Sequence, residues 1–154
     1  MIVNSFVESL KSELETLFND FRLRNEADEK VGFTVYKHAL PIAESADDPE
    51  PFPYIIIQVV DGGTENRKSD EKVRVVLVIG VYDENADNQG TQDVLLAIQR
   101  IRRRFEKNVL LDNKYMVLEP FRWTLADGSQ YPYFLGGVEM TFAIPRYEVE
   151  DKNA

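Results

Sequence analysis

The side chains best suited to chemistry are few and scattered. The chain has one histidine, His38, and no cysteine, so thiolate nucleophiles, disulfides and cysteine-bound metals are excluded. No second histidine exists to complete a metal site with His38, and we interpret this residue as solvent-facing or at the edge of the core. Nucleophile-elbow, dinucleotide-binding and Walker-type glycine patterns are all missing. We therefore predict no catalytic residue, no metal and no cofactor, and we expect that the protein is not an enzyme.

Asp83, Asn85 and Asp87 stand at alternate positions, as at the start of a calcium-binding loop. The pattern fails at its two decisive places, because Asn88 replaces the required glycine and Val94 replaces the chelating glutamate. We interpret these acidic and amide residues as the end of a strand and the cap of the helix that follows.

The densest basic cluster is formed by four arginines near the end of a predicted helix: Arg100, Arg102, Arg103 and Arg104. Three interpretations stay open: a solvated helix face, a contact with an acidic segment of a neighbouring subunit, or a contact with DNA phosphates. The net charge of −9 argues against general or sequence-specific nucleic-acid binding. The candidate residues of an interface with another subunit or a partner are Arg100, Arg103, Arg104, Asp83, Glu84, Asp87, Glu44, Asp47, Asp48 and Glu50.

The stretch from residue 72 to residue 107 must position these arginines. Residues 73–82 predict a central strand that is apolar on both alternating faces, and the turn 83–90 precedes an amphipathic helix. The first face of the strand carries Val73, Val75, Leu77, Ile79 and Val81, and the second carries Val76, Val78 and Tyr82. The buried side of the helix carries Val94, Ile98, Ile101 and Phe105.

The remaining elements are predicted from their periodicity. Ser5 and Glu8 have capping-box spacing, so a first helix is expected to start near Ser5. Strands are expected at 32–37, 54–60, 115–125 and 134–144, with an interruption at Pro120 and a bulge at Gly136–Gly137. The order α-β-β-β-α-β-β predicts an α+β fold, a mainly antiparallel sheet of four to five strands with two helices packed on one face.

We expect one domain over 1–146, with an extended acidic, proline-rich loop at 40–53 and a flexible charged tail at 147–154. No apolar run reaches the roughly 18 residues of a membrane span, and the first residues lack the pattern of a secretion signal, so we expect synthesis in the cytoplasm and no membrane partner. Two helices can cover only one face of a doubly apolar strand. The second face or an edge is therefore expected to be buried by another subunit.

Much of the chain resembles a family. The run FPYIIIQVVDGG, a polar gap, and then VRVVLVIGVYDENADNQGTQDVLLAIQRIRRRF resemble the small tail terminator or tail completion proteins of long-tailed bacteriophages and prophages. The closing YPYFLGGVEMTFAIPR resembles the last strand of that group, so the resemblance extends from about Pro51 to Arg146. The loop 40–53 departs from it.

The resemblance implies a structural subunit that assembles into a homo-oligomeric ring, usually a hexamer, at the head-proximal end of the tail tube of the virion. Such a ring stops tube growth and presents a surface to the head connector, so the implied partners are other copies, the tail tube protein and the head–tail connector protein. DNA would pass through the ring, and an acidic lining would repel its phosphates. Two alternatives stay open: a head-completion or neck protein one ring higher, and a small ligand-binding or enzymatic α+β domain.

Overall fold

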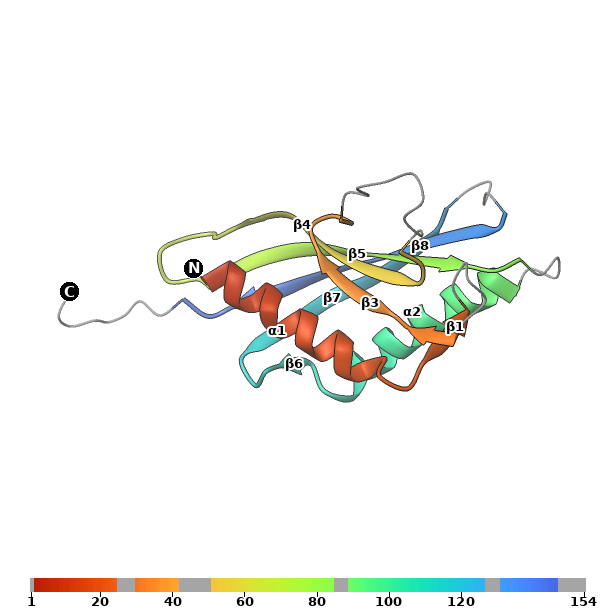
Figure 1. Cartoon of the computed structure of the whole chain (residues 1–154). Helices are drawn as coiled ribbons and strands as arrows, with labels where there is room; N and C mark the ends of the chain where they lie inside the picture. The colour runs from red at the N-terminus through yellow and green to blue at the C-terminus, as the bar shows by residue number, and fades with distance from the viewer. Residues whose placement is uncertain (1, 25–29, 42–50, 85–88, 127–130, 147–154) are drawn as a thin grey trace.

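The computed structural model describes residues 2–24, 30–41, 51–84, 89–126 and 131–146. Figure 1 shows a long, curled sheet with both helices running along one side of it. The elements in chain order are α1 (Ile2–Leu17), β1 (Arg22–Arg24), β2 (Lys30–Gly32), β3 (Thr34–Lys37), β4 (Tyr54–Gly63), β5 (Glu71–Tyr82), α2 (Gln89–Lys107), β6 (Leu110–Leu111), β7 (Tyr115–Leu125) and β8 (Tyr133–Ile144).

The main sheet has six strands in the order β3-β4-β5-β8-β7-β6, and β1 and β2 form a separate two-stranded sheet. Among the described strands of the main sheet, only β3 and β4 run parallel, so the predicted α+β class and mainly antiparallel sheet are confirmed. The six strands of the described main sheet are roughly consistent with the expected four to five. The strand that raises the number is β6, which has two residues and is too short to carry a periodic signal.

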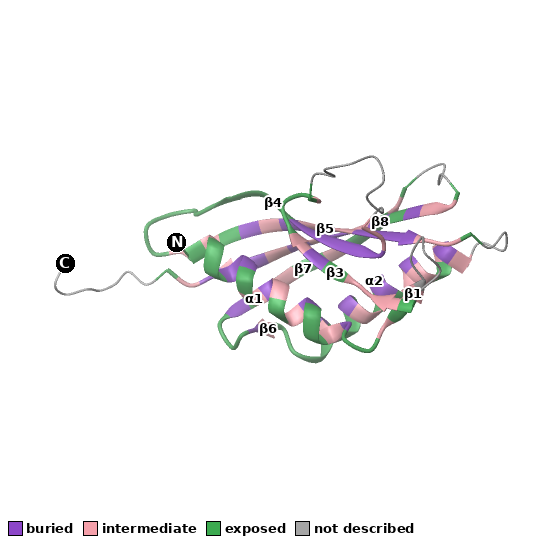
Figure 2. Ribbon diagram, viewed as in Figure 1, coloured by how far each residue is buried: buried purple, intermediate pink, exposed green. Residues whose placement is uncertain are grey.

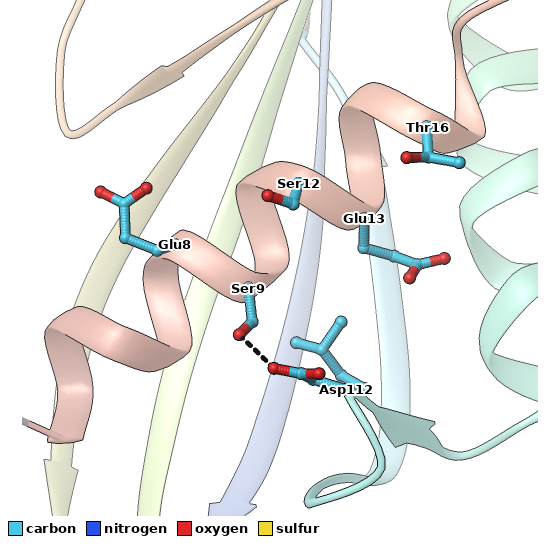
Figure 3. A pocket seen from close by; sticks show the side chains of 7 residues that line it. Glu8, Ser9, Ser12, Glu13, Thr16 and Asp112 are labelled. Carbon is cyan, nitrogen blue, oxygen red and sulfur yellow. Dashed lines mark hydrogen bonds between the residues drawn. The ribbon is translucent and has the colours of Figure 1, made fainter.

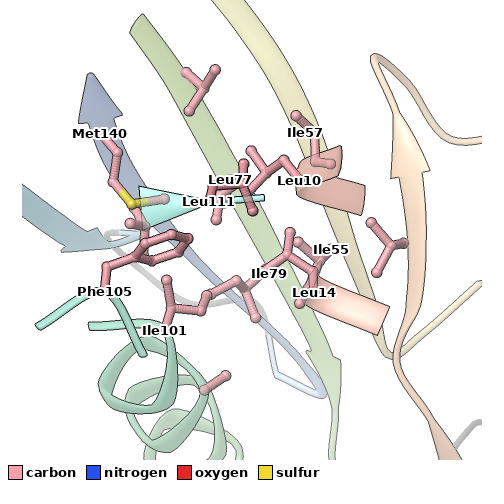
Figure 4. Packing of buried hydrophobic residues seen from close by; sticks show 14 of the residues in the cluster. Leu10, Leu14, Ile55, Ile57, Leu77, Ile79, Ile101, Phe105, Leu111 and Met140 are labelled. Carbon is pink, nitrogen blue, oxygen red and sulfur yellow. The ribbon is translucent and has the colours of Figure 1, made fainter. Parts of the chain in front are cut away.

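The core lies between the helices and one face of the sheet. All five side chains on the first face of β5 are at most 1% exposed, as predicted, and β5 is a central strand. They meet Leu10 and Leu14 of α1 and Ile101 and Phe105 of α2 in a single apolar cluster (Figure 4). In Figure 2 the inner strands β5 and β8 alternate between buried and less buried residues, as expected for strands with one face in the core. Burial of this many aliphatic side chains is the main stabilising contribution to the fold.

Two local predictions have opposite outcomes. The pairing of β7 with β8 shifts register between Leu118 and Arg122, which confirms the interruption at Pro120. The predicted helix start near Ser5 is wrong, because α1 begins at Ile2 and includes Ser5. The apolar spacing of the first helix continues upstream of Ser5, so local capping chemistry did not decide the boundary.

The predicted bulge at Gly136–Gly137 is also wrong. β8 pairs with β5 without interruption there, with Gly136 opposite Ile79 and Gly137 opposite Val78. A β carbon on Gly136 would lie 2.5 Å from the Val94 Cγ1 atom of α2, whereas one on Gly137 would meet nothing nearer than 3.8 Å. Gly136 therefore lets α2 approach the sheet closely.

Some predictions concern residues outside the described ranges, among them the tail 147–154 and most of the loop 40–53. Within the described ranges, neither helix combines the length and the apolar character needed to cross a membrane.

Replacement of Gly136 by Ala should lower the free energy of unfolding by about 1–3 kcal/mol, because the added methyl group forces α2 or Val94 to move. Gly137→Ala is the matched control and should leave stability unchanged or slightly higher, since its β carbon has room and alanine restricts the unfolded chain. Thermal and urea denaturation of the two variants measure the difference. Equal losses for both would show that the contact with Val94 is not the constraint.

Candidate functional site

Among the described elements, no helix covers the face of the sheet that points away from α1 and α2, and we call this face the open face. Register places Val76 and Val78 of β5 on this face, beside Ile56 of β4 and Leu135 of β8. Val76 and Val78 are half-buried, and Leu135 is 38% exposed. The same β5 strand therefore has one fully buried row of side chains and one row that its own subunit covers incompletely (Figure 2).

Aromatic side chains gather at one end of the open face. The ring of Phe52 lies with its centroid 4.9 Å from the ring of Tyr54 and 4.9 Å from that of Tyr133. Tyr82 extends the cluster, with its ring centroid 5.6 Å from that of Tyr133. Tyr54 lies over Gly80, where a β carbon would be only 2.4 Å from the tyrosine ring. The absence of a side chain at Gly80 therefore makes room for the ring of Tyr54. Tyr54 is buried, while Phe52, Tyr82 and Tyr133 are partly exposed, so this end presents aromatic rings of a kind enriched at protein interfaces.

The other end of the open face is charged. Arg74 makes ion pairs with Asp61 at 2.8 Å and with Glu139 at 3.1 Å. The hydrogen bond from Arg74 holds the pKa of the Asp61 carboxyl below its usual value, and the bonds to Asp61 and Glu139 raise the pKa of the Arg74 guanidinium. The open face is therefore mixed in character: it is apolar around Val78 and Leu135 and charged around Arg74.

The structure places the three predicted interface arginines along one groove between the helices. Arg100 donates from Nη1 to the Leu17 carbonyl oxygen at 3.1 Å and to Asp20 Oδ1 at 2.9 Å, and its guanidinium lies 4.8 Å from the centre of the Phe21 ring. This hydrogen bond and charge hold the pKa of the Asp20 carboxyl below its usual value. Arg100 thus fastens α2 to the end of α1.

Arg104 has a similar internal role. It pairs with Glu13 of α1 and donates to the carbonyl oxygens of Asn108 and Leu110, which follow its own helix. These contacts use up most of its five N–H donors. Two of the three arginines predicted for an interface therefore already stabilise the subunit.

Arg103 differs from both, since it is exposed and forms no ion pair with any described residue. It borders the groove between α1 and α2, a hollow of about 680 Å³ that is also lined by Leu96 and Lys107. Leu96 is 50% exposed. The sequence analysis did not identify Leu96 and Lys107. Leu96 lies seven residues before Arg103 and Lys107 four residues after it, and these spacings place all three residues on the same side of a helix.

The acidic residues at the end of β5 contact the segment that leads into β8. The Asp83 N–H donates to the Pro132 carbonyl oxygen at 2.9 Å, the Tyr131 hydroxyl donates to the Glu84 carbonyl oxygen, and the Tyr82 hydroxyl donates to the Glu84 carboxylate. The other acidic candidates, Asp87, Glu44, Asp47, Asp48 and Glu50, lie outside the described residues. Their pairing with arginines of a neighbour stays a prediction.

A polar hollow of about 390 Å³ lies between α1 and the turn after β6 (Figure 3). The Ser9 hydroxyl donates to Asp112 Oδ2 at 2.9 Å, while Glu8 pairs with Lys37 and Glu13 with Arg104. His38 is exposed at the end of β3 and does not line this hollow. Each of these carboxylates has a structural partner, and the described residues show no group of three or more metal-ligating side chains.

Replacement of Arg100 by Met should raise the pKa of Asp20 toward its ordinary value and lower the free energy of unfolding, through loss of the charged hydrogen bonds and the ring contacts. Because the pKa of Asp20 is lowered in the folded protein, its stabilising contribution is present above the ordinary pKa and disappears as the pH falls through the folded value. NMR titration of the Asp20 carboxyl carbon, with denaturation as a function of pH, measures both effects. Arg103→Met is the matched control and should change neither quantity.

Comparison with known proteins adds no family to these observations. No protein-family model matches the chain, and no curated protein matches it either. The open face, the groove between α1 and α2 and the resemblance over residues 51–146 are therefore the basis for inferring a function.

Proposed function

We propose that the chain is a structural assembly protein of a phage or prophage tail, and that its copies form a ring. The observation that carries the proposal is the uneven coverage of the sheet: both helices lie on one face, while Val76, Val78 and Leu135 remain partly exposed on the other. Exposed apolar and aromatic surface of this kind is typical of protein contacts. A second subunit that covered the open face would bury the apolar side chains that α1 and α2 do not cover.

A ring requires that two different surfaces of the subunit meet, because a head-to-tail contact repeats until it closes. The subunit has two candidate surfaces of unlike chemistry. The open face offers apolar and aromatic side chains at one end, and the groove between α1 and α2 offers Arg103, Lys107 and the exposed Leu96. In a protein of net charge −9, the exposed guanidinium of Arg103 is suited to an acidic segment of the next subunit.

The finer assignment to a tail terminator is supported by the resemblance of residues 51–146. In this role the ring caps the tail tube, stops its growth and joins it to the head connector, with no chemical reaction. The excess of negative charge suits a passage for DNA, since it repels the phosphates. The main alternative is a head-completion or neck protein one ring higher, and binding to purified tail tube protein or to the portal-side adaptor separates the two.

Leu135→Asp should abolish ring formation, because it places a charge in the apolar part of the open face. Ile2→Asp is the matched control, since Ile2 is also 38% exposed but lies at the start of α1, and its rings should persist. Negative-stain electron microscopy and light scattering after size exclusion, with and without tail tubes, are the measurements. Both variants should keep the wild-type melting behaviour.

Two outcomes would contradict the proposal. Wild-type protein that stays monomeric at high concentration and does not bind tail tubes has no role in tail assembly. Rings of Leu135→Asp that match those of the wild type would show that the open face is not the contact.

A further inference from the structure

The outer edge of β7 has backbone groups directed away from the sheet. β6 pairs only with Tyr115 and Met116, and the Val117 N–H reaches the Val109 carbonyl oxygen at 2.8 Å. The Ala126 N–H donates to the Leu135 carbonyl oxygen of β8 at 3.0 Å. Because N–H groups alternate sides along a strand, those of Leu125 and Trp123 point outward, where no described strand pairs with them.

Side chains along this edge alternate in character. Trp123 lies opposite the buried Val138, and Leu125 lies opposite Gly136, so both are on the helix side of the sheet. Phe121 is on the same side, because the Arg102 guanidinium of α2 lies 5.2 Å from the centre of its ring. Arg122 and Thr124 are on the open face. The segment therefore reads apolar, polar, apolar, polar, apolar over five residues.

Trp123 is unusually accessible for a tryptophan on the helix side, since it is 46% exposed. It borders a hollow of about 420 Å³ beside α2, which is also lined by Leu95, Arg102 and Glu106. A second hollow, of about 520 Å³, follows along the edge at Phe121 and Val117. An added strand would direct alternate side chains into this space while its backbone completed the hydrogen bonds of the edge.

We propose that the edge of β7 pairs with the same edge of a second copy, antiparallel and across a two-fold axis. The occupant is a second copy because the segment is complementary to itself. With the axis at Trp123 or at Thr124, the alternation matches on both sides: apolar side chains stay on the helix side, and Trp123 meets Trp123 or Leu125 of the second copy. Arg122 lies opposite Thr124 or Ala126 in these registers, so like charges do not face each other.

The paired segment is short, and the resulting contact is expected to be weak. The irregularity around Pro120 interrupts the strand toward its start, which leaves Phe121–Leu125 as the usable edge. A contact this short falls below the size of a standard stable interface. We therefore expect a weak dimer, with a dissociation constant in the micromolar range or higher. An isologous contact also differs from the head-to-tail contact of a ring. The proposed edge pairing therefore does not depend on whether the ring forms.

Leu125→Pro tests the backbone pairing, because it removes an outward N–H and leaves the bonds to β8 in place. Leu125→Ala is the matched control, since it loses the same side chain and keeps the N–H. Sedimentation velocity over a wide concentration range should show dimers of the wild type and of Leu125→Ala, and at least about tenfold weaker association of Leu125→Pro. Trp123 is the sole tryptophan, so its quenching by acrylamide should fall with concentration wherever dimers form. Quenching that is independent of concentration, or equal association of the two variants, would overturn the proposal.

A single-cysteine experiment covers the case in which the proline variant does not fold. The chain has no cysteine, so Thr124→Cys introduces a unique thiol close to the proposed axis. A short bismaleimide should link Thr124→Cys into dimers much faster than Ser12→Cys, whose thiol lies on the exposed side of α1. Adding Leu135→Asp should leave this cross-link intact, which separates failure of the ring from failure of the edge contact. Equal rates at the two thiols would refute the pairing.

Discussion

The structure depends on the burial of one row of β5 beneath two helices. Val73, Val75, Leu77, Ile79 and Val81 are at most 1% exposed, and strands on both sides of β5 extend the same apolar surface. The helices reach this surface from one side only, and Gly136 lets α2 come close enough to pack there. The two helices that complete the core therefore leave the opposite face of the same strands without equivalent cover.

The charges of the subunit follow from this arrangement. Arg100 and Arg104 sit on the side of α2 that faces α1, where they pair with Asp20 and Glu13 and tie the two helices together. Arg103 lies on the exposed side of the same helix turn and has no such partner among the described residues. Three arginines that look equivalent in the sequence are thus divided by helix geometry: Arg100 and Arg104 hold the subunit together, and Arg103 is exposed to another molecule.

The sheet offers two distinct kinds of contact surface. Its open face has side chains of mixed character, with aromatic rings at one end and the ion pairs of Arg74 at the other. The outer edge of β7 offers backbone groups and the half-exposed Trp123. Contacts through a face and through an edge use different atoms, so one subunit can combine a contact that repeats around a ring with a contact that pairs two copies.

The sequence by itself determined the class of the fold, the central place of β5 and the buried side of α2, because alternation in strands and helical periodicity are local properties of the chain. It also determined the irregularity at Pro120, since proline lacks the N–H that a ladder needs. Only the tertiary structure decided the partners of Arg100 and Arg104, the role of Gly136 and the mixed character of the open face. These features depend on which residues distant in the chain become neighbours, and a pattern of spacing carries no information about that.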